Sequence, residues 1–167
     1  MSVTVELAVE DPSWTAVGDL QTLVEDAVAA ALAEAGVEPE DEVELSCLFC
    51  DDDAIRVLNG RWRGKDRPTN VLSFPAAGPG AELMLGDIAV AYGTTVREAE
   101  AEGKRIADHV AHLVIHGTLH LLGEDHEADA EAEAMEALET RAMARLGRPD
   151  PYAGSAPTSG PGASEAP

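Results

Sequence analysis

The segment HGTLHLLGEDH, residues 116–126, carries more information about this protein than any other part of the chain. Its first two histidines are four residues apart, so they lie one turn apart on the same side of a helix. Gly123 then ends the helix, which allows the chain to fold back and bring a third imidazole to the same point. Three neutral imidazoles and one open position form the ligand set of a catalytic zinc ion. The segment therefore predicts one Zn²⁺ bound by His116, His120 and His126.

The spacing also matches the zinc peptidase motif H-E-x-x-H-x-x-G-x-x-H, with one difference. Gly117 stands where the peptidases carry the glutamate that acts as general base. Three neutral ligands leave the charge of the ion uncompensated, so the pKa of a bound water could fall to about 7. A zinc metallopeptidase is therefore an alternative whose base would have to come from another part of the chain.

Residues 106–122 are predicted to form the helix that carries the first two ligands, with four histidines on one stripe beside an apolar face. The apolar face consists of Ile106, Val110, Leu113, Val114, Gly117 and Leu121. His109 and His112 are interpreted either as buried packing residues or as hydrogen-bonding partners of the site. His112 is kept as a candidate that orients a ligand. Asp125 is either another such residue or an exposed turn residue.

The remaining pattern predicts an α+β domain of four strands and about five helices. The strands are expected at 3–9, 43–50, 69–75 and 84–92, and the other helices near 15–36, 51–59, 94–102 and 128–146. The domain is expected to span residues 1–148. Residues 149–167 are rich in proline, glycine, serine and alanine and are interpreted as a disordered tail.

The chain is strongly acidic, with a formal net charge of -21. Such a surface discourages non-specific binding of nucleic acid. However, five of the 11 basic residues lie within a dozen positions, partly in a predicted loop at 61–68. They are Arg56, Arg61, Arg63, Lys65 and Arg67. This cluster is either a patch that binds a few phosphates or a solvated loop.

Two further observations concern location and the cysteines. There is no apolar run of 18 residues and no visible signal peptide, so no membrane association and a cytoplasmic location are expected. Cys47 and Cys50 lie three residues apart in a predicted strand, and such residues point to opposite faces. We therefore expect buried apolar side chains and neither a redox pair nor a second zinc site.

Three blocks of sequence carry a resemblance to a known family. They are LNGRWRGKDRPTNVLSFP at 58–75, LGDI at 85–88, and 112–126 followed by MEALE at 135–139. They are similar to the YbeY-type metal-dependent endoribonucleases, a family of bacterial rRNA maturation factors. One departure is Glu124, where the family usually has an aromatic residue.

The resemblance implies a small mixed sheet with a zinc site in a cleft, and single-strand-specific RNA cleavage. It also implies roles in 16S rRNA 3′-end maturation and late-stage 70S ribosome quality control, with rRNA and the small subunit as partners and no DNA. The family's zinc ligands fall on the three histidines of the opening segment, and its functional arginine falls on Arg63. His116 and Arg63 are thus the candidate catalytic residues, and Arg61, Arg63, Lys65 and Arg67 the candidate substrate-binding residues. A ribosome-assembly factor with a mainly structural zinc is a further alternative.

Overall fold

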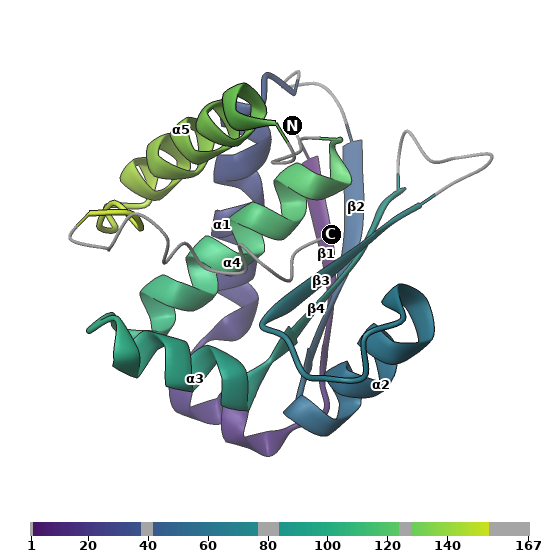
Figure 1. Ribbon diagram of the computed structural model, residues 1–167. Helices are drawn as coiled ribbons and strands as arrows, with labels where there is room; N and C mark the ends of the chain where they lie inside the picture. Colours follow the sequence, from purple (N-terminus) through teal and green to yellow (C-terminus); the bar gives the residue numbers. More distant parts are fainter. Residues whose placement is uncertain (1, 38–41, 77–83, 124–127, 154–167) are drawn as a thin grey trace.

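The computed structural model describes residues 2–37, 42–76, 84–123 and 128–153, which form an α+β fold as expected (Figure 1). The elements are β1 (Ser2–Val9), the 3-10 helix η1 (Pro12–Val17), α1 (Leu20–Glu34), β2 (Glu42–Cys50), α2 (Asp52–Arg63), β3 (Val71–Pro75), β4 (Met84–Ala91), α3 (Tyr92–Ala101), α4 (Ile106–Leu121) and α5 (Asp129–Arg145). None of the helices in the described ranges is long and apolar enough to cross a membrane.

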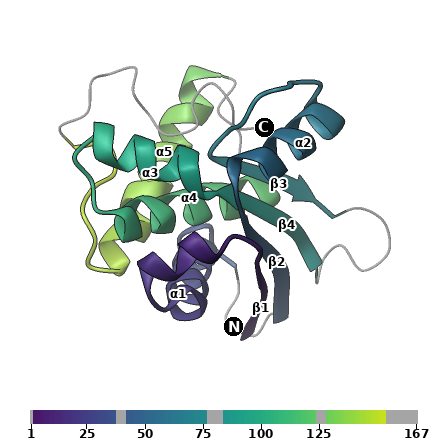
Figure 2. The same ribbon diagram turned by 90° about the horizontal axis from the view of Figure 1, so that it is seen from below.

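The four strands form one mixed sheet in the order β1-β2-β4-β3, so the predicted mixed sheet is confirmed. The pairs β1–β2 and β2–β4 are parallel, and β3 runs antiparallel to β4 at one edge. Helices α1, α4 and α5 lie on one side of the sheet and α2 lies on the other, as both views show (Figures 1 and 2). The larger apolar core fills the space under α1, α4 and α5, and a smaller cluster lies under α2.

Helix α4 is buried on more sides than its apolar pattern predicts. The predicted apolar face is largely buried, but His109, His112 and His116 are also at most 5 % exposed. The reason is that α3 and α5 both contact α4, in addition to α1 and the sheet. The histidine stripe is therefore inside the fold and not beside its core.

Two predicted helix boundaries are wrong, each for a local reason. The first helix was expected from near Thr15, but η1 ends at Gly18 with φ +96, and Asp19 caps a new helix by accepting a hydrogen bond from the backbone N–H of Thr22. Helix α2 was expected to end at Asn59 and continues to Arg63, where Gly64 adopts the left-handed conformation that ends many helices.

The longer α2 places part of the basic cluster in a helix. Arg61 and Arg63 belong to the last turn of α2, where positive charge is favourable next to the negative end of the helix dipole. The segment from Gly64 to Pro68 is the only part of the predicted 61–68 loop that is non-helical. Arg63 is consequently held by regular secondary structure.

Substitution of Gly86 is expected to lower the stability of the fold strongly. Its φ is +141, and a Cβ atom there would lie 2.3 Å from the carbonyl oxygen of Phe74 and 2.9 Å from the backbone nitrogen of Ala76. We expect Gly86→Ala to lower the free energy of unfolding by about 2 to 6 kcal/mol, because backbone strain and overpacking add. The melting temperature should then fall by roughly 5 to 20 °C.

The control for this prediction is Gly103→Ala. Gly103 also has a positive φ, +67, but no atom lies within 4 Å of the added Cβ. Only the conformational cost of about 1–2 kcal/mol should therefore appear. Equal melting temperatures for the two variants would contradict the close approach of β3 and β4 at Gly86.

Cys47 and Cys50 are buried, free and located in different apolar clusters on the two sides of the sheet, as predicted. Burial, and then the negative charges of nearby carboxylates, raise the pKa of each thiol to about 12. Because the thiolate is the reactive form, we expect negligible alkylation by iodoacetamide of the folded protein at pH about 8.5. Both thiols should react once the chain is denatured, as mass spectrometry would show; rapid alkylation in the folded state would contradict the burial.

Candidate metal centre and arginine site

Four histidines form one row along α4. The ring centroids of His109 and His112 are 6.5 Å apart, those of His112 and His116 are 6.4 Å apart, and those of His116 and His120 are 4.6 Å apart. Exposure increases along the row, from 1 % at His109 to an intermediate value at His120. The two predicted ligands are therefore the closest pair and lie at the end of the row that is nearer to solvent.

Glu139 of α5 lies against this row and is itself only 1 % exposed. Its Oε1 atom is 2.5 Å from Nε2 of His112, and its Oε2 atom is 3.0 Å from Nδ1 of His116. Burial alone would raise the pKa of Glu139, but the hydrogen bonds with both histidines outweigh it and hold the pKa well below its ordinary value. Glu139 is therefore a buried carboxylate that is ionised at neutral pH.

The carboxylate determines which nitrogen of His116 would be available to a metal ion. Burial lowers the pKa of His112, so this ring is neutral and donates its Nε2–H to Glu139. A neutral His116 donates its Nδ1–H to the same carboxylate, so that Nε2 carries the lone pair. Carboxylates commonly orient metal-binding histidines in this way.

Sequence reasoning placed Glu139 in a block of resemblance but gave it no role. A signal was present in the sequence, because Glu139 shares a helical face with Met135, Ala142 and Met143. The structure shows that all four residues are buried. A carboxylate on the apolar stripe of an amphipathic helix requires a buried partner. That signal identifies the residue as unusual, although it does not identify His112 and His116 as its partners.

His109 belongs to a separate network. Its Nε2 atom lies 2.9 Å from Oε1 of Glu98 in α3, and the same carboxylate accepts a hydrogen bond from the side chain of Asn70. Of the two interpretations left open for His109, the structure shows a buried residue that links α4 to α3. It lies at the end of the row away from the candidate ligands.

The structure describes only part of the predicted donor set. His126, Asp125 and Glu124 lie outside the described residues, and within the described ranges no group of three His, Cys, Asp or Glu side chains could hold a metal ion. Two neighbouring imidazoles and the carboxylate that orients one of them nevertheless match the chemistry of a zinc site. Gly123, with φ +94, follows α4 immediately before the segment of the third histidine. The residues present fit zinc.

Arg63 is connected to the histidine helix through Ser73 of β3. Its Nη2 atom donates a hydrogen bond of 2.8 Å to the carbonyl oxygen of Ser73, and Oγ of Ser73 donates one of 3.2 Å to the carbonyl oxygen of Gly117. Gly117 directly follows His116 in α4. Two sites 53 positions apart in sequence, 63 and 116, are thus connected around the edge strand of the sheet.

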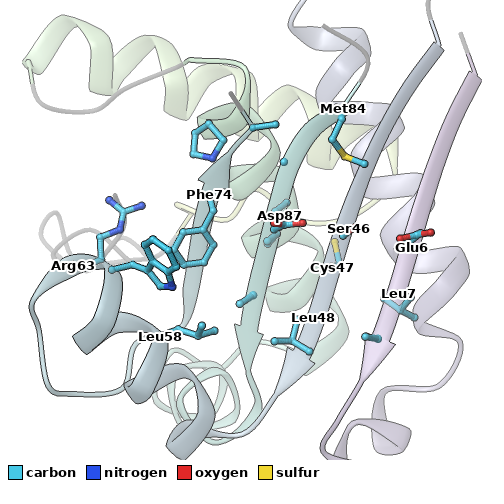
Figure 3. A pocket seen from close by; sticks show the side chains of 17 residues that line it. Glu6, Leu7, Ser46, Cys47, Leu48, Leu58, Arg63, Phe74, Met84 and Asp87 are labelled. Carbon is cyan, nitrogen blue, oxygen red and sulfur yellow. The ribbon is translucent and has the colours of Figure 1, made fainter. Parts of the chain in front are cut away.

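The guanidinium of Arg63 lies 5.8 Å from the ring centroid of Phe74 and is shown beside that ring in Figure 3. Partial burial lowers the pKa of Arg63 below its ordinary value, but a guanidinium remains charged at neutral pH. One of its five N–H donors is used by Ser73, and the others can bind an anion.

The other candidate substrate-binding residues are exposed. Arg61 lies over the ring of Trp62, 5.5 Å from its centroid, and Trp62 is 62 % exposed. Lys65 and Arg67 are exposed in the segment that follows α2. Arg56, also part of the basic cluster, forms an ion pair of 2.8 Å with Asp66. Among the basic residues of the cluster, the structure links Arg63 to the histidine helix.

A cavity of about 1120 Å³, which the sequence did not predict, lies on the face of the sheet opposite α4. Its floor includes Leu7, Leu48 and Met84, with Glu6 and Asp87 among the polar residues (Figure 3). Trp62 and Arg63 lie at its border with α2. Arg63 therefore lines this cavity and also contacts β3, the strand that is hydrogen-bonded to the histidine helix.

Comparison with known proteins identifies the family. The model of a family described as endoribonuclease YbeY matches residues 8–147. An endoribonuclease YbeY from Methylocella silvestris is 49 % identical over 170 residues, which cover 96 % of this chain and 97 % of the relative. One from Rhodopseudomonas palustris is 50 % identical over 154 residues, covering 89 % of each chain.

A solved structure supports the fold. The solution structure of TM1509 from Thermotoga maritima has a TM-score of 0.55 with 24 % identity, and the match covers 86 % of this chain and 91 % of that one. At this identity the likeness concerns the fold alone. The family match and the two relatives, which span nearly the whole chain, show that the chain belongs to the endoribonuclease YbeY family.

Proposed function

We propose that this chain is a zinc-dependent endoribonuclease that cleaves single-stranded RNA and acts in 16S rRNA 3′-end maturation and late-stage 70S ribosome quality control. Membership of the family supports cleavage of RNA. The observation that carries the proposal is the connection of Arg63 through Ser73 to the helix of His116 and His120. The proposed partners are rRNA and the small subunit in the cytoplasm, without DNA.

The proposed ligands are His116, His120 and His126, with one ion per chain. A bound zinc ion supplies Lewis acidity and lowers the pKa of a coordinated water to about 7. Glu139 keeps Nδ1 of His116 protonated and Nε2 directed to the ion. His112 holds the other oxygen of Glu139. Asp125 retains its proposed role as an additional hydrogen-bond acceptor for a ligand.

Arg63 has the proposed role of binding the phosphodiester. Its planar guanidinium can contact two phosphate oxygens and stabilise the negative charge that grows during cleavage. The contact with Ser73 holds the side chain at the edge of β3. Arg61, Lys65 and Arg67 are proposed to bind neighbouring phosphates, and the exposed ring of Trp62 offers a surface for stacking a base. The acidic remainder of the chain restricts RNA to this region.

The surroundings of Gly117 argue against the metallopeptidase alternative. A Cβ atom at Gly117 would lie 3.1 Å from Oγ of Ser73 and 3.2 Å from two side-chain atoms of Ile88. Position 117 therefore faces the sheet, and a glutamate there would meet β3 and β4. In the peptidases this position carries the general base, whereas in this chain it packs against the sheet.

The decisive experiment combines metal analysis with RNA cleavage. We expect about one zinc per chain, and cleavage of a single-stranded 16S 3′-end precursor that stops on treatment with a chelator and returns when zinc is added. Duplex RNA and DNA of the same sequence, and casein, serve as controls that should remain intact. Cleavage at an unchanged rate by the metal-free protein would refute the zinc-dependent mechanism.

A further inference from the structure

We propose that Tyr152, in the segment that follows α5, is a positioning residue of the zinc site and acts through Glu139. The proposal rests on the zinc site proposed above. Tyr152 lies beyond residue 147, where the match to the family model ends, and within the stretch that composition assigned to a tail. Pro151 is nevertheless buried and Tyr152 is half-buried, so packing extends past the expected domain end at 148.

Two contacts place Tyr152 in the histidine network. Its hydroxyl donates a short hydrogen bond to Oε1 of Glu139, the oxygen that also accepts from His112. Its ring packs edge-on against the ring of His112, with centroids 5.4 Å apart and an angle of 83°. Burial, and then the charge of Glu139, raise the pKa of the Tyr152 hydroxyl, so it stays protonated and remains a donor.

The segment that carries Tyr152 is attached to the rest of the fold near the start of α4. Nζ of Lys104, in the turn between α3 and α4, donates a hydrogen bond of 2.7 Å to the carbonyl oxygen of Pro151. Arg148 forms an ion pair of 2.6 Å with Asp108 in the first turn of α4. The segment that leads to Tyr152 is therefore fixed at two points, Arg148 and Pro151, near the start of α4.

The geometry gives the hydroxyl a specific effect. Oε2 of Glu139 accepts from His116, a proposed ligand, whereas Oε1 accepts from His112 and Tyr152. Rotation of the carboxylate about its terminal bond would break the contacts of both oxygens. Two donors on Oε1 therefore hold Oε2 against Nδ1 of His116 and keep Nε2 directed to the ion. Tyr152 stabilises the orientation of a ligand without contacting the ion.

The test is Tyr152→Phe in the full chain, which removes the hydroxyl and keeps the ring. We expect zinc affinity, measured by competition with a chromophoric chelator, to fall by about 10-fold, the lower end of the range for residues that orient ligands. The visible absorption spectrum of the Co²⁺-substituted protein should also change. Glu139→Gln should cause a larger loss of affinity. The matched control is Tyr92→Phe, which removes a hydroxyl from a ring that packs on Trp14 and should leave both measurements unchanged.

The outcomes separate the two proposals. If the wild-type chain binds zinc and Tyr152→Phe matches it in affinity or in the Co²⁺ spectrum, the role of Tyr152 is wrong and the zinc site stands. If the wild-type chain binds neither zinc nor Co²⁺, the zinc site itself is wrong. A loss of affinity with a changed spectrum, confined to Tyr152→Phe and Glu139→Gln, supports the positioning role.

Discussion

Replacement of His116 by alanine should abolish zinc binding and RNA cleavage together. The substitution removes a proposed ligand and also the group that occupies Oε2 of the buried Glu139. Loss of a residue that only orients a ligand costs about 10–100-fold in metal affinity, so loss of the ligand itself should cost more than about 100-fold. Cleavage should fall below detection because the proposed mechanism depends on the ion. Zinc content of the purified variant and a cleavage assay provide the measurements.

His109→Gln is the control for this substitution. His109 occupies the same row of α4 and is also buried, but its hydrogen bond goes to Glu98 in α3. The variant should lose some stability, on the order of 1–3 kcal/mol, because a buried hydrogen bond is disturbed. Its zinc content should equal that of the wild type. A His116→Ala variant with one tightly bound zinc per chain would remove the basis of the metal site.

Arg63→Glu should separate the two effects, with zinc retained and cleavage lost. The arginine contacts β3 and is not among the proposed ligands, so metal content should not change. Its charge is proposed to stabilise the transition state, and loss of such a group costs about 10²–10³-fold in rate. Reversal of the charge also repels the phosphate, which adds to the effect. Single-turnover cleavage of the 16S precursor measures it.

Arg105→Glu makes the same change of charge at an exposed position at the start of α4 and should cleave normally. Retained cleavage in Arg63→Glu would reject the phosphate-binding role. The same variant addresses the ribosome-assembly alternative, because it is expected to hold zinc without cleaving. Full rescue of rRNA processing in cells by Arg63→Glu would favour binding over catalysis, whereas failure of rescue supports the nuclease.

Much of the fold follows from local sequence patterns. Local sequence patterns predicted all four strands to within two residues, and the mixed sheet was expected from the family resemblance. The errors occurred where one residue decides a boundary. Gly18 separates η1 from α1, and Gly64 ends α2 one turn later than the basic cluster suggested. A positive φ at glycine depends on the surrounding packing, so composition alone did not select these positions over their neighbours.

The sequence by itself determined the row of histidines, because residues three and four apart lie on one side of a helix whatever the helix packs against. It also indicated Arg63 through the family resemblance. Only the tertiary structure placed Glu139 between His112 and His116, brought Tyr152 to the same carboxylate, and connected Arg63 to Gly117 through β3. These contacts join different elements, and no local periodicity encodes them. They depend on how α2, α5 and the segment after α5 pack against the sheet and α4, where each buried polar group must find a partner.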